Sequence, residues 1–201
     1  MTALAGSKLV IIPTDTVYGI AADARRDRAV ARISAAKGRP EAMPLQLLFA
    51  NSIDLVGRYV RLSRPAILLV EALGPGAWTI VCRSVPTFRS PALAGGATIG
   101  FRIPDAPVVH RIVERLGGPL AASSANRHGA QSPTTCAAAV TQVGASCVVA
   151  LDGGPCPVGT DSTVIDCSEP EVRILREGAI ARERVARILG VSEIQVLRSV
   201  R

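Results

Sequence analysis

Short apolar runs alternate with segments of helical periodicity along most of the chain. Apolar positions spaced three or four residues apart, such as Val108, Ile112 and Leu116, indicate amphipathic helices. Runs rich in Val, Ile and Leu between Gly and Pro indicate strands. The predicted strands cover residues 9–12, 45–49, 78–83, 98–103, 120–122, 147–151, 163–166 and 173–175. The predicted helices cover residues 28–36, 65–73, 107–116, 134–143 and 179–189. This mixture predicts an α/β or α+β fold around one twisted sheet.

Local signals mark where several of these helices begin and end. Pro107 suits a first helical turn, and residues 132–134 offer a cap for the helix that follows. Gly38, Gly117 and Gly144 are placed to end their helices. No repeat or long linker divides the 201 residues, so the sequence predicts a single domain over residues 1–201.

Composition narrows the class of protein. Hydrophobic residues make up 48% of the chain but aromatic residues only 3%, so aliphatic side chains must fill the core. No apolar run reaches the roughly 18 residues of a membrane span, and the N-terminus lacks a signal-peptide pattern. The sequence therefore predicts a cytoplasmic protein with no membrane partner.

Charge adds a second constraint. The net charge is +7, which favours nucleic acids or phosphorylated ligands without choosing between them. Arginine supplies nearly all the positive charge, and Lys37 is one of only two lysines. The five cysteines show no CxxC spacing and no neighbouring histidine, so we expect free thiols rather than a metal site.

The segment PTDTVYG follows the first predicted strand directly. Thr14, Asp15 and Thr16 would lie at the carboxyl end of that strand, where α/β sheets commonly bind ligands. The alternative is a hydroxyl-rich turn that caps its own amides. Alone, the segment does not decide between them.

Two further segments carry cations. In AAKGRP, Lys37 and Arg39 flank a glycine and could reach one polyanion, or could simply cap a helix end. In ATIGFRIP, strand alternation places Arg102 on one face with Thr98 and Gly100. That face suggests an anionic ligand, with an exposed edge-strand arginine as the alternative.

Three later segments place hydroxyls, an amide and an arginine beside strands. They are SSAN with Ser124 and Asn126, SPT with Ser132, and DST with Ser162, and Arg176 follows the last predicted strand. Such groups can bind phosphate or a nucleoside, or can act as ordinary caps. The chain lacks GxxxxGK[ST], GxGxxG and GxSxG, so the sequence does not support a Walker ATPase, a Rossmann dehydrogenase or a hydrolase triad.

Taken in order, PTDTVYG, KGRP, PGAWTIV, TIGFRIP, SSAN, SPT, STVID and LREG resemble the YrdC-type threonylcarbamoyl-AMP synthase family, in its short single-domain form. The resemblance covers about residues 9–189. It implies a twisted, mostly parallel or mixed sheet flanked by helices, with a basic concave pocket. It also implies a nucleotidyltransferase that converts L-threonine, bicarbonate and ATP to L-threonylcarbamoyl-adenylate and pyrophosphate. A partner enzyme would then transfer the threonylcarbamoyl group to tRNA.

The resemblance also implies roles for individual residues. Lys37 and Arg39 would bind the ATP phosphates and carry the catalysis, with Mg²⁺ arriving on ATP and no metal site made by the protein alone. The implied L-threonine site consists of Thr14, Arg102, the backbone of Ala122, and Ser162. The implied nucleotide site adds Thr98, Ser124, Asn126, Ser132 and Arg176.

Some features depart from the family pattern. Many members have Asn at the position of Met43 and His near Leu48, so threonine binding is expected to differ in detail. Members also carry a helix before the first strand, where this chain has eight residues. Two other functions stay open: a related enzyme that makes carbamoyl-adenylate, and a non-catalytic module that binds double-stranded RNA or tRNA. Threonine-dependent release of pyrophosphate distinguishes all three.

Overall fold

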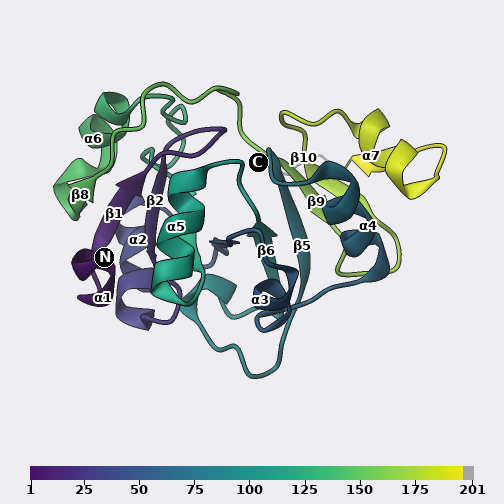
Figure 1. Cartoon of the computed structure of the whole chain (residues 1–201), viewed down its shortest axis with the longest axis horizontal. Coiled ribbons are helices and arrows are strands. Elements are labelled where there is room, and N and C mark those ends of the chain that lie inside the picture. Colours follow the sequence, from purple (N-terminus) through teal and green to yellow (C-terminus); the bar gives the residue numbers. More distant parts are fainter. Residues whose placement is uncertain (197–201) are drawn as a thin grey trace.

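The computed structural model describes residues 1–196, in which the strands join one sheet (Figure 1). The sheet order is β11-β10-β9-β5-β6-β3-β7-β2-β1-β8, and β4 pairs with β5 outside this path. The strands are β1 Leu9–Ile12, β2 Gly19–Asp23, β3 Gln46–Leu48, β4 Val60–Arg61, β5 Trp78–Ser84, β6 Thr98–Arg102, β7 Leu120–Ser124, β8 Cys147–Ala150, β9 Thr163–Asp166, β10 Arg173–Arg176 and β11 Gln195–Val196. The α-helices are α1 Thr2–Ala5, α2 Asp27–Lys37, α3 Ile53–Gly57, α4 Arg64–Leu73, α5 Pro107–Leu116, α6 Cys136–Val143 and α7 Arg182–Leu189.

The sheet is mixed, which agrees with the predicted mostly parallel or mixed sheet flanked by helices. Within residues 1–196, six of the ten strand pairings are antiparallel. Short connections explain several of them, since a parallel pair needs a crossover of a dozen or more residues. Residues 13–18, which join β1 to β2, are too few for such a crossover.

All eight predicted strands form, within one or two residues, but β2, β4 and β11 were not predicted. β2 is a central strand between β1 and β7, yet its sequence GIAAD has a single β-branched residue. Pairing on both edges therefore outweighs its weak strand propensity. The helices α1 and α3 were also not predicted, and α1 occupies part of the short segment before β1.

Helix ends follow the sequence signals in most cases. Pro107 begins α5, and Gly38 and Gly117 end their helices in the left-handed conformation, with φ of 62° and 68°. The cap predicted at residues 132–134 is wrong, because the Thr135 side chain caps α6 by accepting from the backbone N–H of Ala138. The last helix begins at Arg182 rather than at residue 179.

The two faces of the sheet bury different helices. Alternation along β1 sends Leu9 and Ile11 to a core shared with α2, α4 and α7, and Val10 and Ile12 to a core shared with α1 and α5. In Figure 1, α5 lies over the half of the sheet that contains β1 and β2. The same face over β5, β6 and β9 has no covering helix within the described chain, and this is where the polar strand residues point.

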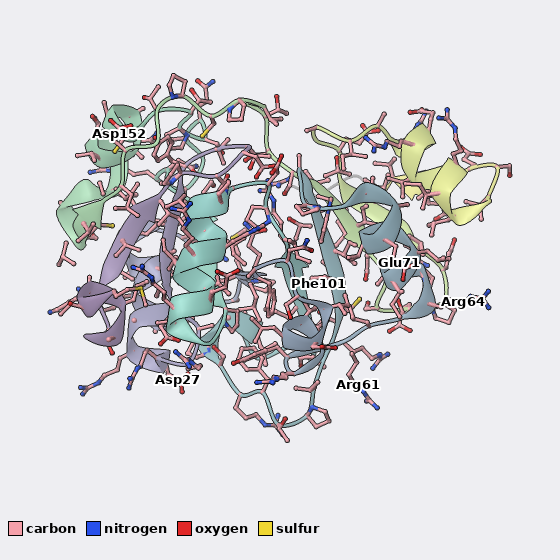
Figure 2. All side chains as sticks on the ribbon, viewed as in Figure 1. Asp27, Arg61, Arg64, Glu71, Phe101 and Asp152 are labelled. Atoms are coloured by element: carbon pink, nitrogen blue, oxygen red, sulfur yellow. The ribbon has the colours of Figure 1, made fainter. Side chains whose placement is uncertain are left out.

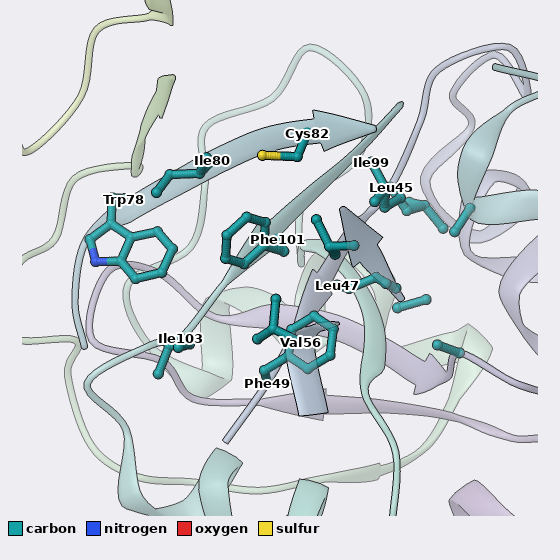
Figure 3. Packing of buried hydrophobic residues seen from close by; sticks show 14 of the residues in the cluster. Leu45, Leu47, Phe49, Val56, Trp78, Ile80, Cys82, Ile99, Phe101 and Ile103 are labelled. Carbon is teal, nitrogen blue, oxygen red and sulfur yellow. The ribbon is translucent and has the colours of Figure 1, made fainter. Parts of the chain in front are cut away.

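Aromatic side chains anchor the larger core (Figure 3). Phe101 on β6 contacts Trp78 edge-on with ring centroids 5.8 Å apart, and Phe49 with centroids 6.5 Å apart. All three side chains are fully buried. In Figure 2, charged side chains such as Asp27, Arg61 and Arg64 lie at the periphery, away from Phe101. This packing fixes the opposite face of β6, which carries Thr98, Gly100 and Arg102.

We expect Phe101→Ala to lower the free energy of unfolding by about 3–5 kcal/mol, because it removes a buried ring and leaves a cavity. Urea unfolding followed by circular dichroism measures the change. Val148→Ala is the control, since Val148 is 57% exposed and should change the value by about 0.5 kcal/mol or less. Equal effects of the two substitutions would contradict this description of the core.

Candidate active site

A polar pocket of about 380 Å³ lies on the uncovered part of the sheet. Strand ends and loops from both halves of the chain contribute to it. Seven of the eleven predicted site residues line it: Arg39, Thr98, Arg102, Ala122, Ser124, Ser162 and Arg176. Further lining residues come from positions that were not predicted as site residues, namely Thr16, Gln46, Thr79, Ser123, Asp161 and Asp166. The four predicted residues outside the lining are Thr14, Lys37, Asn126 and Ser132.

Arg102 is the most buried cation in the pocket, with only 3% of its surface exposed. Its guanidinium donates to Asp15 Oδ1 at 2.6 Å, to Thr16 Oγ1 at 2.6 Å and to the carbonyl of Gly76 at 2.9 Å. Burial lowers the pKa of Arg102, and the neighbouring Asp15 opposes that shift. The second oxygen of Asp15, Oδ2, is buried without a hydrogen-bond partner in the described structure. The pair thus holds a fixed cation at one end of the pocket.

The hydroxyl-rich turn after β1 divides into structural and pocket-facing positions. Thr14 donates to the carbonyl of Val17 at 2.6 Å and accepts from the backbone N–H groups of Thr16 and Val17, so its hydroxyl serves the turn. Thr16 instead accepts from Arg102 and lines the pocket. Both readings of the segment PTDTVYG therefore apply, each to a different threonine.

Lys37 lies beside the pocket rather than in its lining. Its ammonium group donates to the carbonyls of Ser124 and Asn126 and to Asn126 Oδ1, and so joins the end of α2 to the turn after β7. Burial lowers the pKa of Lys37 to about 8, with a smaller contribution from Arg39, while Asp161 opposes the shift. A charged Lys37 therefore positions the residues that follow β7.

Arg39 reaches the pocket from the loop after α2. It donates to Ser123 Oγ at 3.3 Å and to the carbonyls of Met43 and Pro44, which hold the guanidinium against the pocket wall. Burial lowers the pKa of Arg39. Its buried Nε has no partner within the described residues, so the group keeps an unused donor.

A chain of hydrogen bonds crosses the floor of the pocket. Arg176 donates to Ser162 Oγ at 3.1 Å, Ser162 Oγ lies 2.8 Å from Thr79 Oγ1, and Thr79 donates to Gln46 Oε1 at 2.9 Å. A bulge between β10 and β9 brings Arg176 to this place. Alternation along β5 indicates that Thr79 faces away from the core, since its neighbours Trp78 and Ile80 face it. The pairing of β5 with β9, which brings Thr79 close to Ser162, could not be predicted from the sequence.

The floor is open because β6 carries a glycine there. Thr98, Gly100 and Arg102 all line the pocket, which confirms the face predicted from alternation. A Cβ atom built on Gly100 would lie 3.1 Å from the methyl group of Thr79 and 3.7 Å from Gln46 Cβ. Any larger residue would therefore fill the space between the two ends of the pocket.

The carboxylates near the pocket bear on metal binding. Among residues 1–196, no group of three or more His, Cys, Asp or Glu side chains could hold a metal ion. Asp161 lines the pocket and accepts from Ser132 Oγ at 3.2 Å. One carboxylate suits a Mg²⁺ ion that is held mainly by nucleotide phosphates, since Mg²⁺ commonly binds through one or two carboxylates and its substrate.

Comparison with known proteins identifies the family. The model of the Sua5/YciO/YrdC family, described as "Telomere recombination", matches residues 2–178. The chain belongs to the Sua5/YciO/YrdC family. The resemblance found from the motifs is thereby confirmed, and the match includes every predicted site residue.

Related members of the Sua5/YciO/YrdC family carry the name of an enzyme. A putative threonylcarbamoyl-AMP synthase of Mycobacterium tuberculosis is 36% identical over 94% of this chain and 87% of its own length. The threonylcarbamoyl-AMP synthase of Bacillus subtilis is 34% identical over 92% of this chain. This chain spans 54% of the B. subtilis protein, so the longer relatives include sequence with no counterpart here.

Solved structures of the family share the fold. Pyrococcus abyssi Sua5 complexed with L-threonine matches 98% of this chain and 57% of its own, with a TM-score of 0.92 and 31% identity. Escherichia coli YciO matches with a TM-score of 0.79 at 21% identity, which supports the fold alone. Within residues 1–196, no helix combines the length and the apolar character needed to cross a membrane.

We expect Asp15→Asn to lower the free energy of unfolding by about 3–5 kcal/mol, because the buried Arg102 would lose its counter-charge. Denaturant titration measures the change. Glu169→Gln is the matched control, since it removes one partner of the exposed Arg83–Glu169 pair and should cost about 1 kcal/mol or less. A loss at Asp15 no larger than that of the control would show that Arg102 does not depend on this carboxylate.

The lowered pKa of Lys37 predicts a pH dependence of stability. Between about pH 8 and the ordinary pKa of 10.5, the unfolded chain binds a proton at Lys37 that the folded protein has released. Linkage therefore makes the free energy of unfolding rise with pH in this window, by up to about 1.4 kcal/mol per pH unit, relative to Lys37→Met.

Denaturant titrations at several pH values between 7 and 10.5 test this expectation. Lys8→Met is the control, because Lys8 is the other lysine of the chain and is exposed. Parallel pH profiles for the wild type and Lys37→Met would contradict the lowered pKa.

Proposed function

We propose that this chain is an L-threonylcarbamoyl-AMP synthase, a nucleotidyltransferase that acts on L-threonine, bicarbonate and ATP. The observation that carries the proposal is the pocket itself. It holds a buried, paired Arg102 at one end and Arg39 with Arg176 beyond it, in a chain whose fold matches a Sua5 protein complexed with L-threonine. One pocket with separate cationic groups suits two anionic substrates that must react with each other.

Arg102 is proposed to bind the carboxylate of L-threonine. Its position is fixed by Asp15, Thr16 and the Gly76 carbonyl, so little ordering is needed when the substrate arrives. The guanidinium plane also suits a carboxylate, which accepts two parallel hydrogen bonds. Ala122 and Ser162 line the same pocket and would complete this subsite, and Thr14 would support it through its turn.

The nucleotide is proposed to bind toward Arg39 and Arg176. Both arginines line the pocket with Thr98 and Ser124, which supply cations and hydroxyl donors for phosphate and ribose. Lys37, Asn126 and Ser132 lie behind this wall. Lys37 would act on the phosphates only after exchanging its carbonyl partners, and otherwise it holds the turn after β7 in place.

The chemistry needs positioning more than a nucleophile from the protein. The amine of L-threonine and bicarbonate give a carbamate and water, a carbamate oxygen attacks the α-phosphorus of ATP, and pyrophosphate leaves. Such a transfer depends on alignment and on neutralising charge in the transition state. Arg39, together with Lys37 once it has turned to the phosphates, would offset the charge on the departing pyrophosphate.

Magnesium is proposed to arrive with ATP. Asp161 and Asp166 are carboxylates in the pocket lining that could help to hold it. When bound, the ion would neutralise part of the phosphate charge. The adenylate would then pass to a partner enzyme that modifies tRNA in the cytoplasm, with direct contact to tRNA favoured by the net charge of +7.

The purified protein is expected to form threonylcarbamoyl-adenylate and pyrophosphate only when ATP, Mg²⁺, bicarbonate and L-threonine are all present. Mass spectrometry of the adenylate and an enzymatic assay of pyrophosphate, with each component omitted in turn, measure this. Product without threonine would instead indicate carbamoyl-adenylate chemistry. No product, with salt-sensitive binding of RNA, would favour a binding module.

A variant pair ties the activity to the pocket. Arg39→Met is expected to lower turnover by about 10² to 10³-fold, the usual loss when one charge-stabilising contact in a transition state is removed. Arg182→Met is the control, because Arg182 is exposed and pairs only with its neighbour Glu183 in the described structure. Similar turnover of both variants would remove Arg39 from the proposed site.

A further inference from the structure

Gln46 is a polar residue in the floor of the pocket. The proposed function assigns it no role. It lies on β3, between Gly100 of β6 and Ala122 of β7, and its side chain lines the pocket. Its neighbours on the strand are the fully buried Leu47 and the buried Leu45. Gln46 is half-buried, so a polar atom of its carboxamide without a protein partner can meet solvent or a ligand in the pocket.

The hydrogen-bond chain fixes which way the carboxamide points. Arg176 can only donate, so Ser162 Oγ accepts from it, and the Ser162 hydroxyl can then donate to Thr79. Thr79 in turn donates its proton to Gln46 Oε1. With the amide reversed, one of these two hydroxyl protons would have no acceptor among residues 1–196. The Gln46 amino group, Nε2, has no hydrogen-bond partner in that part of the chain and is free to donate to a ligand.

The level of Gln46 in the sheet identifies the part of the substrates that it faces. Gln46 is level with Gly100, midway between Thr98 and Arg102, each two residues away along β6 or roughly 7 Å. Thr98 belongs to the proposed nucleotide end and Arg102 to the proposed threonine carboxylate. Gly100 and Gln46 both line the pocket at this midpoint, where no side chain of β6 projects into it.

We propose that Gln46 binds bicarbonate, with Nε2 donating to one of its anionic oxygens. Thr79 and Ser162 keep lone pairs beside it that can accept the hydroxyl proton of bicarbonate, so the site offers both a donor and acceptors. A neutral amide binds a single negative charge without attracting the phosphates away from Arg39 and Arg176. This inference rests on the proposed function and adds the site of its third substrate.

Two substitutions separate this role from a structural one. Gln46→Met keeps the volume but removes both polar atoms. Gln46→Glu keeps an oxygen that accepts from Thr79, but it removes the donor and adds a charge that repels an anion. If Gln46 serves only to hold Thr79, Gln46→Glu should behave like the wild type; if it binds bicarbonate, both variants should fail.

The experiment measures the KM for bicarbonate, L-threonine and ATP in buffer depleted of carbon dioxide, with pyrophosphate release as the readout. We expect both variants to raise the bicarbonate KM by about tenfold or more, the usual effect of losing a hydrogen bond to a charged group. The neutral variant Gln46→Met should change the other two KM values by less than about twofold. Thr79→Val should raise the same KM, and Thr79→Ser should restore it. Gln195→Met, at an exposed glutamine outside the pocket lining, is the control.

A bicarbonate KM near the wild-type value in Gln46→Glu would overturn the inference, as would an equal rise of all three KM values in Gln46→Met. Circular dichroism and the unchanged KM for ATP establish that the variants are folded. A wild-type protein with normal threonine- and bicarbonate-dependent activity but an insensitive Gln46 contradicts this inference alone. A wild-type protein without that activity contradicts the proposed function, and this inference with it.

Discussion

The site exists because one helix cannot cover one whole face of an eleven-stranded sheet. An α-helix with its side chains is about 10 Å wide, and neighbouring strands are about 4.8 Å apart, so α5 covers only two or three strands. It is placed over β1, β2 and β7, where apolar side chains such as Val10 and Leu120 face it. Beyond it the same face of the sheet carries Thr98, Arg102 and Thr79 instead. The boundary between apolar and polar residues on that face is thus also the boundary of the pocket.

The sequence predicts which residues of a single strand share a face, but it does not predict which strands become neighbours in the sheet. Alternation alone places Thr98, Gly100 and Arg102 on one face, and the structure confirms it, because period-2 geometry is local. Gln46 and Thr79 went unnoticed because each is a single polar residue with an apolar residue on either side of it. Their meaning depends on which strands become neighbours, and that is decided by long-range pairing such as β5 with β9 and β3 with β6. The antiparallel pairings and the short strand β2 escaped prediction for the same reason.

The cations of the site are held in different ways. Arg102 has a carboxylate partner, Lys37 has carbonyl oxygens, and Arg39 has two carbonyls and a hydroxyl. Among these three cations, only Arg102 forms an ion pair within residues 1–196, so Lys37 and Arg39 keep charges that no carboxylate pairs with directly. Carbonyl dipoles orient a cation without cancelling its charge, which preserves attraction for a polyanion such as a nucleotide. The sequence indicates the charges, but not which of them the fold has already paired.

Gly100 affects the space in the pocket through the Cβ atom that it lacks. Gly100 lines the pocket without a side chain, and a single methyl group there would press against the Thr79 methyl at 3.1 Å. The backbone of Gly100 has no left-handed conformation, so alanine would meet no conformational barrier, only a lack of space. Substitutions at Gly100 would therefore change the size of the reactants that fit on this sheet, although Gly100 itself has no functional group.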